Sequence, residues 1–189
     1  TREEWASLTW RVMSCLMVGG GIGVDYSRIR ASGKNLARTG GRASGPLPLI
    51  HAINEIGRGV MQGGSRRSAI YASLNWQHED IPNFLKAKNW NEQIWTGRKS
   101  NGWLKEQNFN FPAPLDMTNI SINYNDAWLD RNDRCGDIEM GEIDTSSVFY
   151  KNCLQAMSTG EPGFSFNFGD KEIDTSSVFY KNCLQAMST

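Results

Sequence analysis

Several common features are scarce or absent in this 189-residue chain. Its four cysteines show neither C-x-x-C spacing nor a paired framework, and only two histidines are present, so no metal site or disulfide-bonded domain is predicted. The longest weakly polar run, 13–24, contains four glycines and is shorter than the roughly 20 apolar residues of a membrane helix. We therefore expect no membrane span and a reducing, cytoplasmic location.

The two ends of the sequence are unusual. The chain starts at Thr1 with no basic segment leading into an apolar run, so we expect no secretory signal and interpret the start as an internal cut. Near the other end, the segment 142–159 recurs letter for letter as 172–189. Two identical copies are too few for a solenoid, which indicates a recent duplication or an assembly fault.

Charge is balanced overall but unevenly placed. Residues 1–70 hold ten Lys/Arg and four Asp/Glu, whereas residues 71–189 hold ten and sixteen, so the two parts carry +6 and −6. For any single charge, a solvated surface is the ordinary explanation. Arginines that alternate with glycines inside loops instead favour an anionic ligand near the first part.

Two stretches rich in glycine and arginine, 19–46 and 62–69, flank a predicted helix between Pro48 and Gln62. Glycine lets the backbone adopt positive φ and approach a ligand closely, and arginine offers a planar fork of donors to phosphate. The pair of loops is therefore typical of a nucleotide site.

Periodicity predicts alternating strands and helices. Strands are expected over 69–74, 118–124 and 164–168, and a strand or an extended segment leading into a loop is expected over 22–31. Helices are expected over 2–18, from Asp80 to about Lys88, after a capping Asp126 and within 142–159. The recurring order of strand then helix indicates an α/β architecture with parallel strands.

Two common nucleotide motifs do not fit. The dinucleotide fingerprint fails because Gly21-x-Gly23 follows a predicted helix and has Tyr26 in place of the third glycine. A Walker loop fails because Gly33-Lys34 has Arg28 at the position of the first glycine and is followed by Asn35.

Four blocks of sequence, in this order, resemble the catalytic chain of ribonucleotide reductases, and most of all the class II, adenosylcobalamin-dependent ribonucleoside-diphosphate reductases. They are residues 19–46, 62–67, 108–121 and 159–167. The resemblance implies a ten-stranded α/β barrel of two half-barrels, of which this chain is a fragment of the first. We accordingly expect a partial barrel domain over 1–170, with 171–189 as an artefactual second copy of 142–159.

The resemblance also implies roles for particular residues. An effector site for a deoxynucleoside triphosphate is expected at Arg30, Lys34, Arg38, Arg42 and Ser44. Substrate-binding positions are expected at Gly20, Gly21, Gln62 and Arg66. A specificity loop that relays the identity of the effector is expected at Gly63, Gly64, Ser65 and Arg67.

For the whole enzyme, the resemblance implies reduction of a ribonucleotide substrate by a cysteine thiyl radical, for DNA synthesis. Adenosylcobalamin as cofactor, a thioredoxin-type reductant and a homodimer are further implications. The family's Asn-x-Cys-x-Glu motif should follow 160–163, where the duplicated segment stands instead. Asn152-Cys153-Leu154-Gln155 has the wrong spacing and no acid, so no catalytic residue is assigned, and we expect the fragment alone to be inactive.

Two alternatives remain at this point. The chain can belong to the large chain of the di-iron-dependent, class I branch, which differs in its radical source. It can also be a non-catalytic nucleotide- or nucleic-acid-binding module that uses its arginines on phosphates, although net neutrality and the lack of a recognised motif disfavour this. The arginines in question are Arg28, Arg30, Arg38, Arg42, Arg66 and Arg67.

Overall fold

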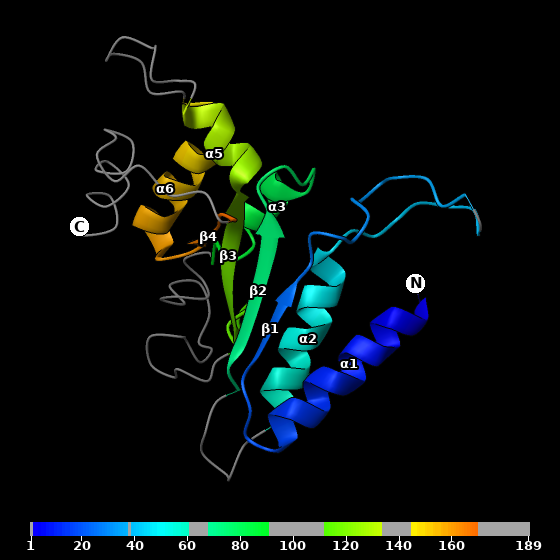
Figure 1. The fold of residues 1–189 in the computed structure, drawn as a ribbon. Coiled ribbons are helices and arrows are strands. Elements are labelled where there is room, and N and C mark those ends of the chain that lie inside the picture. The colour runs from blue at the N-terminus through cyan, green and yellow to red at the C-terminus, as the bar shows by residue number, and fades with distance from the viewer. Residues whose placement is uncertain (1, 38, 61–67, 91–111, 134–144, 170–189) are drawn as a thin grey trace, which may run out of the picture.

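The structure, a computed structural model, describes residues 2–37, 39–60, 68–90, 112–133 and 145–169. Helices and strands follow one another in nearly the predicted positions (Figure 1). The elements are α1 (Arg2–Met17), β1 (Ile22–Asp25), α2 (Leu47–Gly59), β2 (Ile70–Asn75), α3 (Ile81–Leu85), β3 (Thr118–Asn125), α5 (Asp126–Asp133), α6 (Val148–Thr159) and β4 (Gly163–Asn167). No described helix is both long and apolar enough to cross a membrane.

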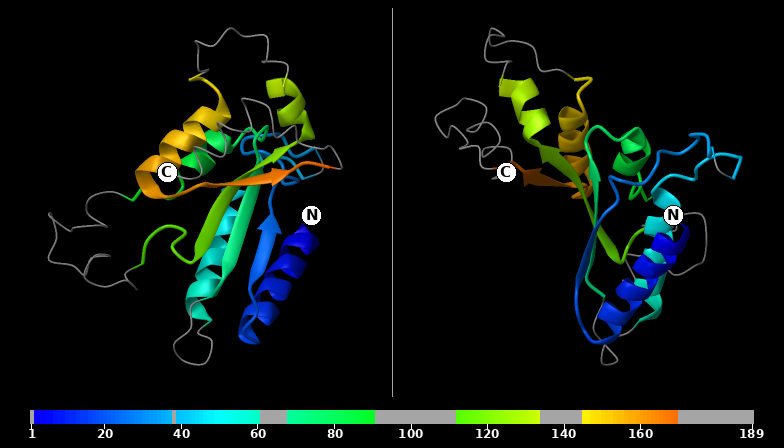
Figure 2. Two further views of the ribbon diagram at one scale, coloured as in Figure 1. Left: turned by 60° about the vertical axis from the view of Figure 1, so that its left-hand side comes forward. Right: turned by 45° about the vertical axis from the view of Figure 1, so that its right-hand side comes forward.

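The four strands form one parallel sheet in the order β1-β2-β3-β4, which confirms the predicted α/β class and parallel pairing. Strand order thus equals chain order. One hydrophobic core joins Leu16 of α1, Ile53 of α2 and Phe84 of α3 to Leu74 of β2 and Ile122 of β3. Figure 2 shows α1 and α2 side by side along β1 and β2. The helices therefore cover one face of the sheet.

The two faces of the sheet differ sharply in polarity. On the helix-covered face, β2 and β3 present buried apolar residues, namely Ile70, Ala72, Leu74, Ile120, Ile122 and Tyr124. On the opposite face they present Tyr71, Ser73, Asn75, Asn119, Ser121, Asn123 and Asn125. Sheets of purely parallel strands are ordinarily apolar on both faces. The second face of this sheet is instead lined with hydroxyl and amide groups.

The strand register aligns these polar side chains into rows. Asp25, Ser73, Ser121 and Gly163 are successive partners across the four strands. Within the sheet, the Asn123 Nδ2 atom donates a hydrogen bond to Ser73 Oγ at 3.0 Å. Gly163 fits its row because a Cβ atom there would lie 2.8 Å from Ser121 Oγ.

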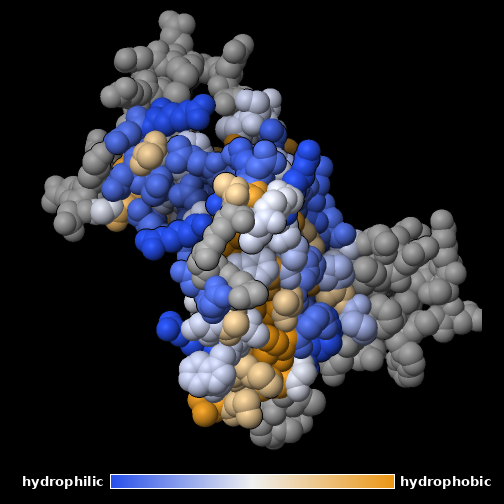
Figure 3. Space-filling model, turned by 90° about the vertical axis from the view of Figure 1, so that its right-hand side faces the viewer, coloured by the Kyte–Doolittle hydropathy of each residue, from blue (hydrophilic) through white to orange (hydrophobic). Residues whose placement is uncertain are grey.

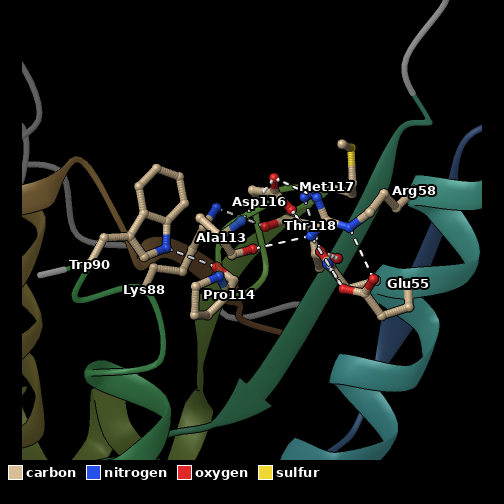
Figure 4. A network of polar contacts seen from close by, with 10 residues as sticks. Glu55, Arg58, Lys88, Trp90, Ala113, Pro114, Asp116, Met117 and Thr118 are labelled. Atoms are coloured by element: carbon tan, nitrogen blue, oxygen red, sulfur yellow. Dashed lines mark hydrogen bonds and ion pairs between the residues drawn. The ribbon is translucent and has the colours of Figure 1, made fainter. Parts of the chain in front are cut away.

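The amino ends of β2 and β3 are tied to α2 by a dense polar network (Figure 4). Arg58 Nη2 lies 2.6 Å from Asp116 Oδ1, and Arg58 Nε lies 2.9 Å from Glu55 Oε2. The buried Asn54 Oδ1 accepts hydrogen bonds from Met117 N and from the Thr118 hydroxyl at 2.9 and 3.0 Å. These contacts fix the start of β3 against the last turns of α2.

A lysine extends this closed end toward β4. Lys88 Nζ donates to the carbonyl of Thr118 at 2.8 Å and lies 2.7 Å from Glu161 Oε2. The same Glu161 carboxylate accepts the backbone N–H of Ile120 at 3.2 Å. The start of β3 and the segment before β4 are therefore joined through one largely buried cation, Lys88.

Some predicted boundaries are wrong. β1 ends at Asp25 and not at residue 31, because the Ser27 amide donates to Asp25 Oδ1 at 3.0 Å and starts a turn. Asp126 is the first residue of α5 and not its cap; Asn125 Oδ1 accepts the Trp128 amide at 3.4 Å. α3 stops at Leu85, earlier than predicted.

The outer side of α1 is apolar and exposed. Trp10, Met13, Met17 and the following Val18 are between 46% and 84% exposed. Figure 3 shows hydrophobic residues gathered on this side of the molecule, toward the end of α1. Among the described residues, nothing covers this strip.

Candidate functional site

The long glycine-rich loop between β1 and α2 is a hairpin, residues 33–43. Its two arms exchange backbone hydrogen bonds, from Gly33 N to Ala43 O at 2.8 Å and from Ala43 N to Lys34 O at 2.7 Å. Gly40 and Gly41 have φ of +70° and +81°, values that side chains with a Cβ rarely adopt. Glycine is thus required for the reversal of direction, and the hairpin projects beyond the sheet (Figure 1).

The neck of the hairpin, formed by Ala31, Ser32, Gly45 and Pro46, closes around Asp80. The Ser32 amide donates to Asp80 Oδ2 at 2.9 Å. On the returning arm, Gly45 has φ of +80°, and a Cβ atom there would lie 3.0 Å from the same oxygen. The carboxylate therefore occupies the point where the two arms of the hairpin meet.

His78 makes a second contact with the loop. Its Nε2 atom lies 2.8 Å from the carbonyl oxygen of Ile29, and its Nδ1 atom lies 3.1 Å from the Asp80 amide nitrogen. Because a carbonyl only accepts and an amide N–H only donates, the ring donates through Nε2 and accepts at Nδ1 in this arrangement. The imidazole side chain is 7% exposed, so this contact is nearly dry.

A polar groove of about 740 Å³ opens beside the neck, at the carboxyl ends of β1 and β2. It is lined by Ser27, Arg30, Ala31, Lys34, Asn35, Asn75, Gln77, His78 and Glu79. In α/β sheets, ligands bind outside the carboxyl ends of the strands. The lining offers two cations, four groups with amide or hydroxyl hydrogen bonds and one carboxylate, a set suited to a polar anion.

The two cations of the groove are only lightly engaged. Arg30 Nη1 donates to the carbonyl of Asn35 at 3.3 Å, which uses one of the five N–H donors of the guanidinium. Lys34 Nζ lies 2.7 Å from Glu79 Oε1, and both side chains are more than half exposed. Exposed ion pairs contribute about 0–1 kcal/mol, so an anionic ligand can replace Glu79 as the partner of Lys34.

The predicted effector residues are partly brought together. Arg30 and Lys34 line the groove, whereas Arg42 pairs with Asn35 across the hairpin and Ser44 is exposed on its returning arm. Arg38 lies outside the described residues, as do the predicted loop residues Gln62, Gly63, Gly64, Ser65, Arg66 and Arg67.

The predicted substrate positions lie at the opposite end of the sheet. Gly20 and Gly21 form the turn between α1 and β1, where Cβ atoms would lie 2.7 Å from Cys15 Sγ and 3.3 Å from Ala69 Cβ. The carboxyl end of α2 and the start of β2 lie at this amino end too (Figure 1), where the Ser68 hydroxyl donates to the carbonyl of Val60 at 3.1 Å. The 13 residues of α2, about 20 Å long, separate the two predicted sets.

Sequence reasoning missed the residues that fix the groove. Asp80 was predicted only as the start of a helix, yet its side chain makes no capping bond in α3 and turns to Ser32 instead. His78, Asn75 and Gln77 were not singled out at all. The available signal was a His-x-Asp triplet between a buried strand and a proline-started helix, but its partners lie about 48 residues earlier in the chain.

The described residues do not identify a site for a corrin cofactor. No group of three His, Cys, Asp or Glu side chains within the described ranges is placed to hold a metal ion. Burial raises the pKa of the Cys153 thiol, which disfavours its thiolate. The lining of the groove fits a phosphate and not the broad face of a corrin, so these residues are given no role in holding one.

Comparisons with known proteins point in one direction. Residues 7–167 match the family model described as ribonucleotide reductase, barrel domain. The vitamin B12-dependent ribonucleoside-diphosphate reductase of Mycobacterium tuberculosis is 30% identical over 158 residues, which cover 78% of this chain and 20% of that protein. The large chain of the Schizosaccharomyces pombe ribonucleoside-diphosphate reductase is 37% identical over 78 residues, covering 39% and 10%.

A solved structure shows the same fold. The alpha subunit of the class Id ribonucleotide reductase of Actinobacillus ureae superposes with a TM-score of 0.57 at 14% identity, over 88% of this chain and 25% of that one. The chain therefore spans about a fifth of the length of the curated relative that it matches over most of its own residues.

Proposed function

Since this chain belongs to the ribonucleotide reductase barrel-domain family, we propose that it forms part of an enzyme that reduces ribonucleotides to deoxyribonucleotides for DNA synthesis. The similarity to vitamin B12-dependent relatives over 78% of the chain supports the adenosylcobalamin-dependent branch. The shorter match to a large chain from yeast keeps the di-iron branch as the second candidate. In either branch the ribonucleotide is the substrate and a thioredoxin-type protein is the reductant.

Within that enzyme, the groove binds the phosphates of a deoxynucleoside triphosphate effector. One observation carries this proposal: the fold brings Arg30 and Lys34 to the rim of a polar groove at the carboxyl end of the sheet. Arginine grips phosphate oxygens with a planar fork, and lysine adds a point charge. Arg42 and Ser44, on the returning arm, extend the polar surface available to the ligand.

The substrate is handled at the amino end of the sheet, beside the carboxyl end of α2. Gly21 lies beside Ala69, which follows in sequence the loop that contains Gln62 and Arg66, and Gly20 precedes Gly21 directly. In this proposal, that loop also carries the specificity residues Gly63, Gly64, Ser65 and Arg67. α2 runs from the neck of the hairpin to this loop, so a ligand in the groove and a ligand at the loop act on opposite ends of one rigid element.

The apolar strip on α1, made of Trp10, Met13, Met17 and Val18, supports a homodimer. Contiguous exposed apolar side chains on one helix are typical of an interaction surface. Replacement of Trp10 by Glu is expected to lower the molar mass measured by light scattering if two copies meet at this strip. An unchanged dimer would exclude the strip as the interface.

The test of the effector site is a binding measurement on the 189-residue chain with each of the four deoxynucleoside triphosphates, at two salt concentrations. Saturable binding that prefers one base supports the proposal. Tight binding of unrelated DNA sequences that falls steeply as salt rises favours the nucleic-acid-binding alternative instead. Inorganic triphosphate serves as the control, because it reports the contribution of the phosphates alone.

A further inference from the structure

The hairpin projects beyond the sheet (Figure 1), yet it carries Lys34, one of the two cations of the groove, and the other, Arg30, lies just before it. Within the described residues of the hairpin, the backbone hydrogen bonds run between its two arms or back to Ala31 at its neck. Its attachment to the rest of the chain therefore lies in the turn after β1 and in the neck. Three consecutive residues of the β2–α3 connection, His78, Glu79 and Asp80, each contact this region.

Two of these contacts are buried and one is exposed. Asp80 and His78 side chains are 8% and 7% exposed, and they hold the Ser32 amide and the Ile29 carbonyl. Ile29 and Ser32 flank Arg30, so the backbone on both sides of that arginine is fixed. The Glu79 carboxylate, which is 62% exposed, contacts the Lys34 ammonium in water.

We propose that the segment 78–80 is a positioning latch for the anion-binding groove, in which Asp80 and His78 hold Arg30 in place while Glu79 competes with the ligand for Lys34. The inference rests on the proposed phosphate-binding function of the groove. Asp80 and His78 are positioning residues: they act on the ligand through the backbone around Arg30. Glu79 acts in the opposite direction, because its negative charge occupies the lysine that a phosphate needs.

The geometry gives the three side chains different consequences. A hydrogen bond to a buried carboxylate is stronger than one between neutral groups, and its loss leaves the Ser32 amide without a partner. An exposed ion pair is weak, so its removal frees Lys34 with little structural change. Loss of Asp80 should therefore weaken anion binding, and loss of the charge of Glu79 should strengthen it.

The experiment combines hydrogen exchange with nucleotide binding on the 189-residue chain. In Asp80→Ala, we expect the amides of residues 32–43 to exchange about tenfold faster and the dissociation constant for the preferred deoxynucleoside triphosphate to rise about tenfold. Asp80→Asn keeps an oxygen that can accept the Ser32 N–H and should restore most of both properties. Glu79→Gln should leave exchange unchanged and lower the dissociation constant about threefold.

Two further variants separate positioning from general stability. Asp116→Asn alters another buried carboxylate, at the amino end of the sheet, and should lower global stability without selective exchange in the hairpin. If Asp80→Ala does not fold, His78→Phe and His78→Gln repeat the comparison, because only the glutamine can donate to Ile29 O.

The outcomes are distinct. If Asp80→Ala and His78→Phe leave both exchange of residues 32–43 and nucleotide affinity unchanged, or if Glu79→Gln weakens binding, the latch is wrong while the proposed function stands. If the wild-type chain binds no nucleotide, the proposed function is wrong, and so is the role of residues 78–80 in positioning a ligand site. Hydrogen exchange then tests only whether residues 78–80 hold the hairpin in place.

Discussion

The two ends of the parallel sheet are built in opposite ways. At the amino end, Arg58 and Lys88 are each surrounded by acidic and carbonyl oxygens and are largely buried. At the carboxyl end, Arg30 and Lys34 stand at the rim of an open groove with one light contact each. A cation whose N–H groups are already bound by protein oxygens stabilises the fold. A cation whose N–H groups mostly face solvent is available to a ligand. The same residue types thus serve stability at one end and, in our proposal, binding at the other.

The largest effect is expected from breaking the closed end. Arg58→Met removes both hydrogen bonds to the Asp116 carboxylate, whose side chain is fully buried. The carboxylate keeps the Ala113 amide at 3.4 Å but loses its cation, and the loss of one charge of a buried ion pair destabilises a protein by about 3 kcal/mol. Urea unfolding followed by circular dichroism should show this loss, while affinity for nucleotide at the other end stays unchanged. A stable Arg58→Met variant would remove the distinction between the two ends.

A pair of glycines near the end of α2 tests how tightly the amino end is packed. At Gly57, an added Cβ atom would overlap Ile70 Cδ1, and the Ile70 side chain is enclosed in the core and has little room to shift, so Gly57→Ala is expected to cost about 1–2 kcal/mol. At Gly59, nothing lies within 4 Å of the added atom, and Gly59→Ala is expected to stabilise by about 0.5 kcal/mol. Thermal unfolding of both variants measures the difference. Equal changes in the free energy of unfolding for the two variants would mean that α2 and β2 can move apart slightly without loss of stability.

At the open end, we expect a change in binding without a change in stability. Arg30→Gln removes a cation from the groove and should weaken binding of a nucleoside triphosphate about tenfold, or roughly 1.4 kcal/mol. Arg28→Gln is the matched control, because Arg28 is also exposed but is not among the residues that line the groove. Titration calorimetry measures both. Equal losses would indicate diffuse attraction of charge and not a site.

The smallest effect concerns pH at the closed end. The hydrogen bond from Arg58 holds the pKa of Glu55 below its usual value, although partial burial opposes this. Its stabilising contribution is therefore present above the unfolded pKa of about 4.5 and is lost as the pH falls through the lower folded pKa. Because the side chain is mostly exposed, the change should be about 0.5 kcal/mol or less. Glu55→Gln should remove it from urea unfolding curves measured between pH 6 and pH 3.

The sequence was informative where the pattern was local. The apolar stripe of α2, the buried runs of β2 and β3 and the glycine that ends α6 all predicted their elements. Gly160 has φ of +82°, as expected for a residue that closes a helix. The resemblance carried by four short blocks is confirmed by the family match over residues 7–167.

Predictions from the sequence pattern were wrong where a side chain forms hydrogen bonds with backbone that the pattern does not take into account. Tyr26, Arg28 and Arg30 alternate like a strand, but Asp25 and Ser27 turn the chain before this alternation can form a ladder. Asp80 stands where a capping residue would, yet its carboxylate bonds Ser32 across 48 positions. Arg30 and Lys34 were named from the sequence and line the groove, but their role in binding an effector stays a prediction. The contacts of Asp80 and His78 with the segment around Arg30 are tertiary contacts that no local spacing encodes.

The match between strand order and chain order has a consequence for synthesis of the protein. Each strand pairs with the one before it, at separations of 48 residues for β1 with β2, 48 for β2 with β3 and 42 for β3 with β4. Among the four described strands, each of β2, β3 and β4 can pair with a strand that has already been translated. As the ribosome releases the chain, every new strand meets an edge that already exists, so the sheet can grow in the direction of translation.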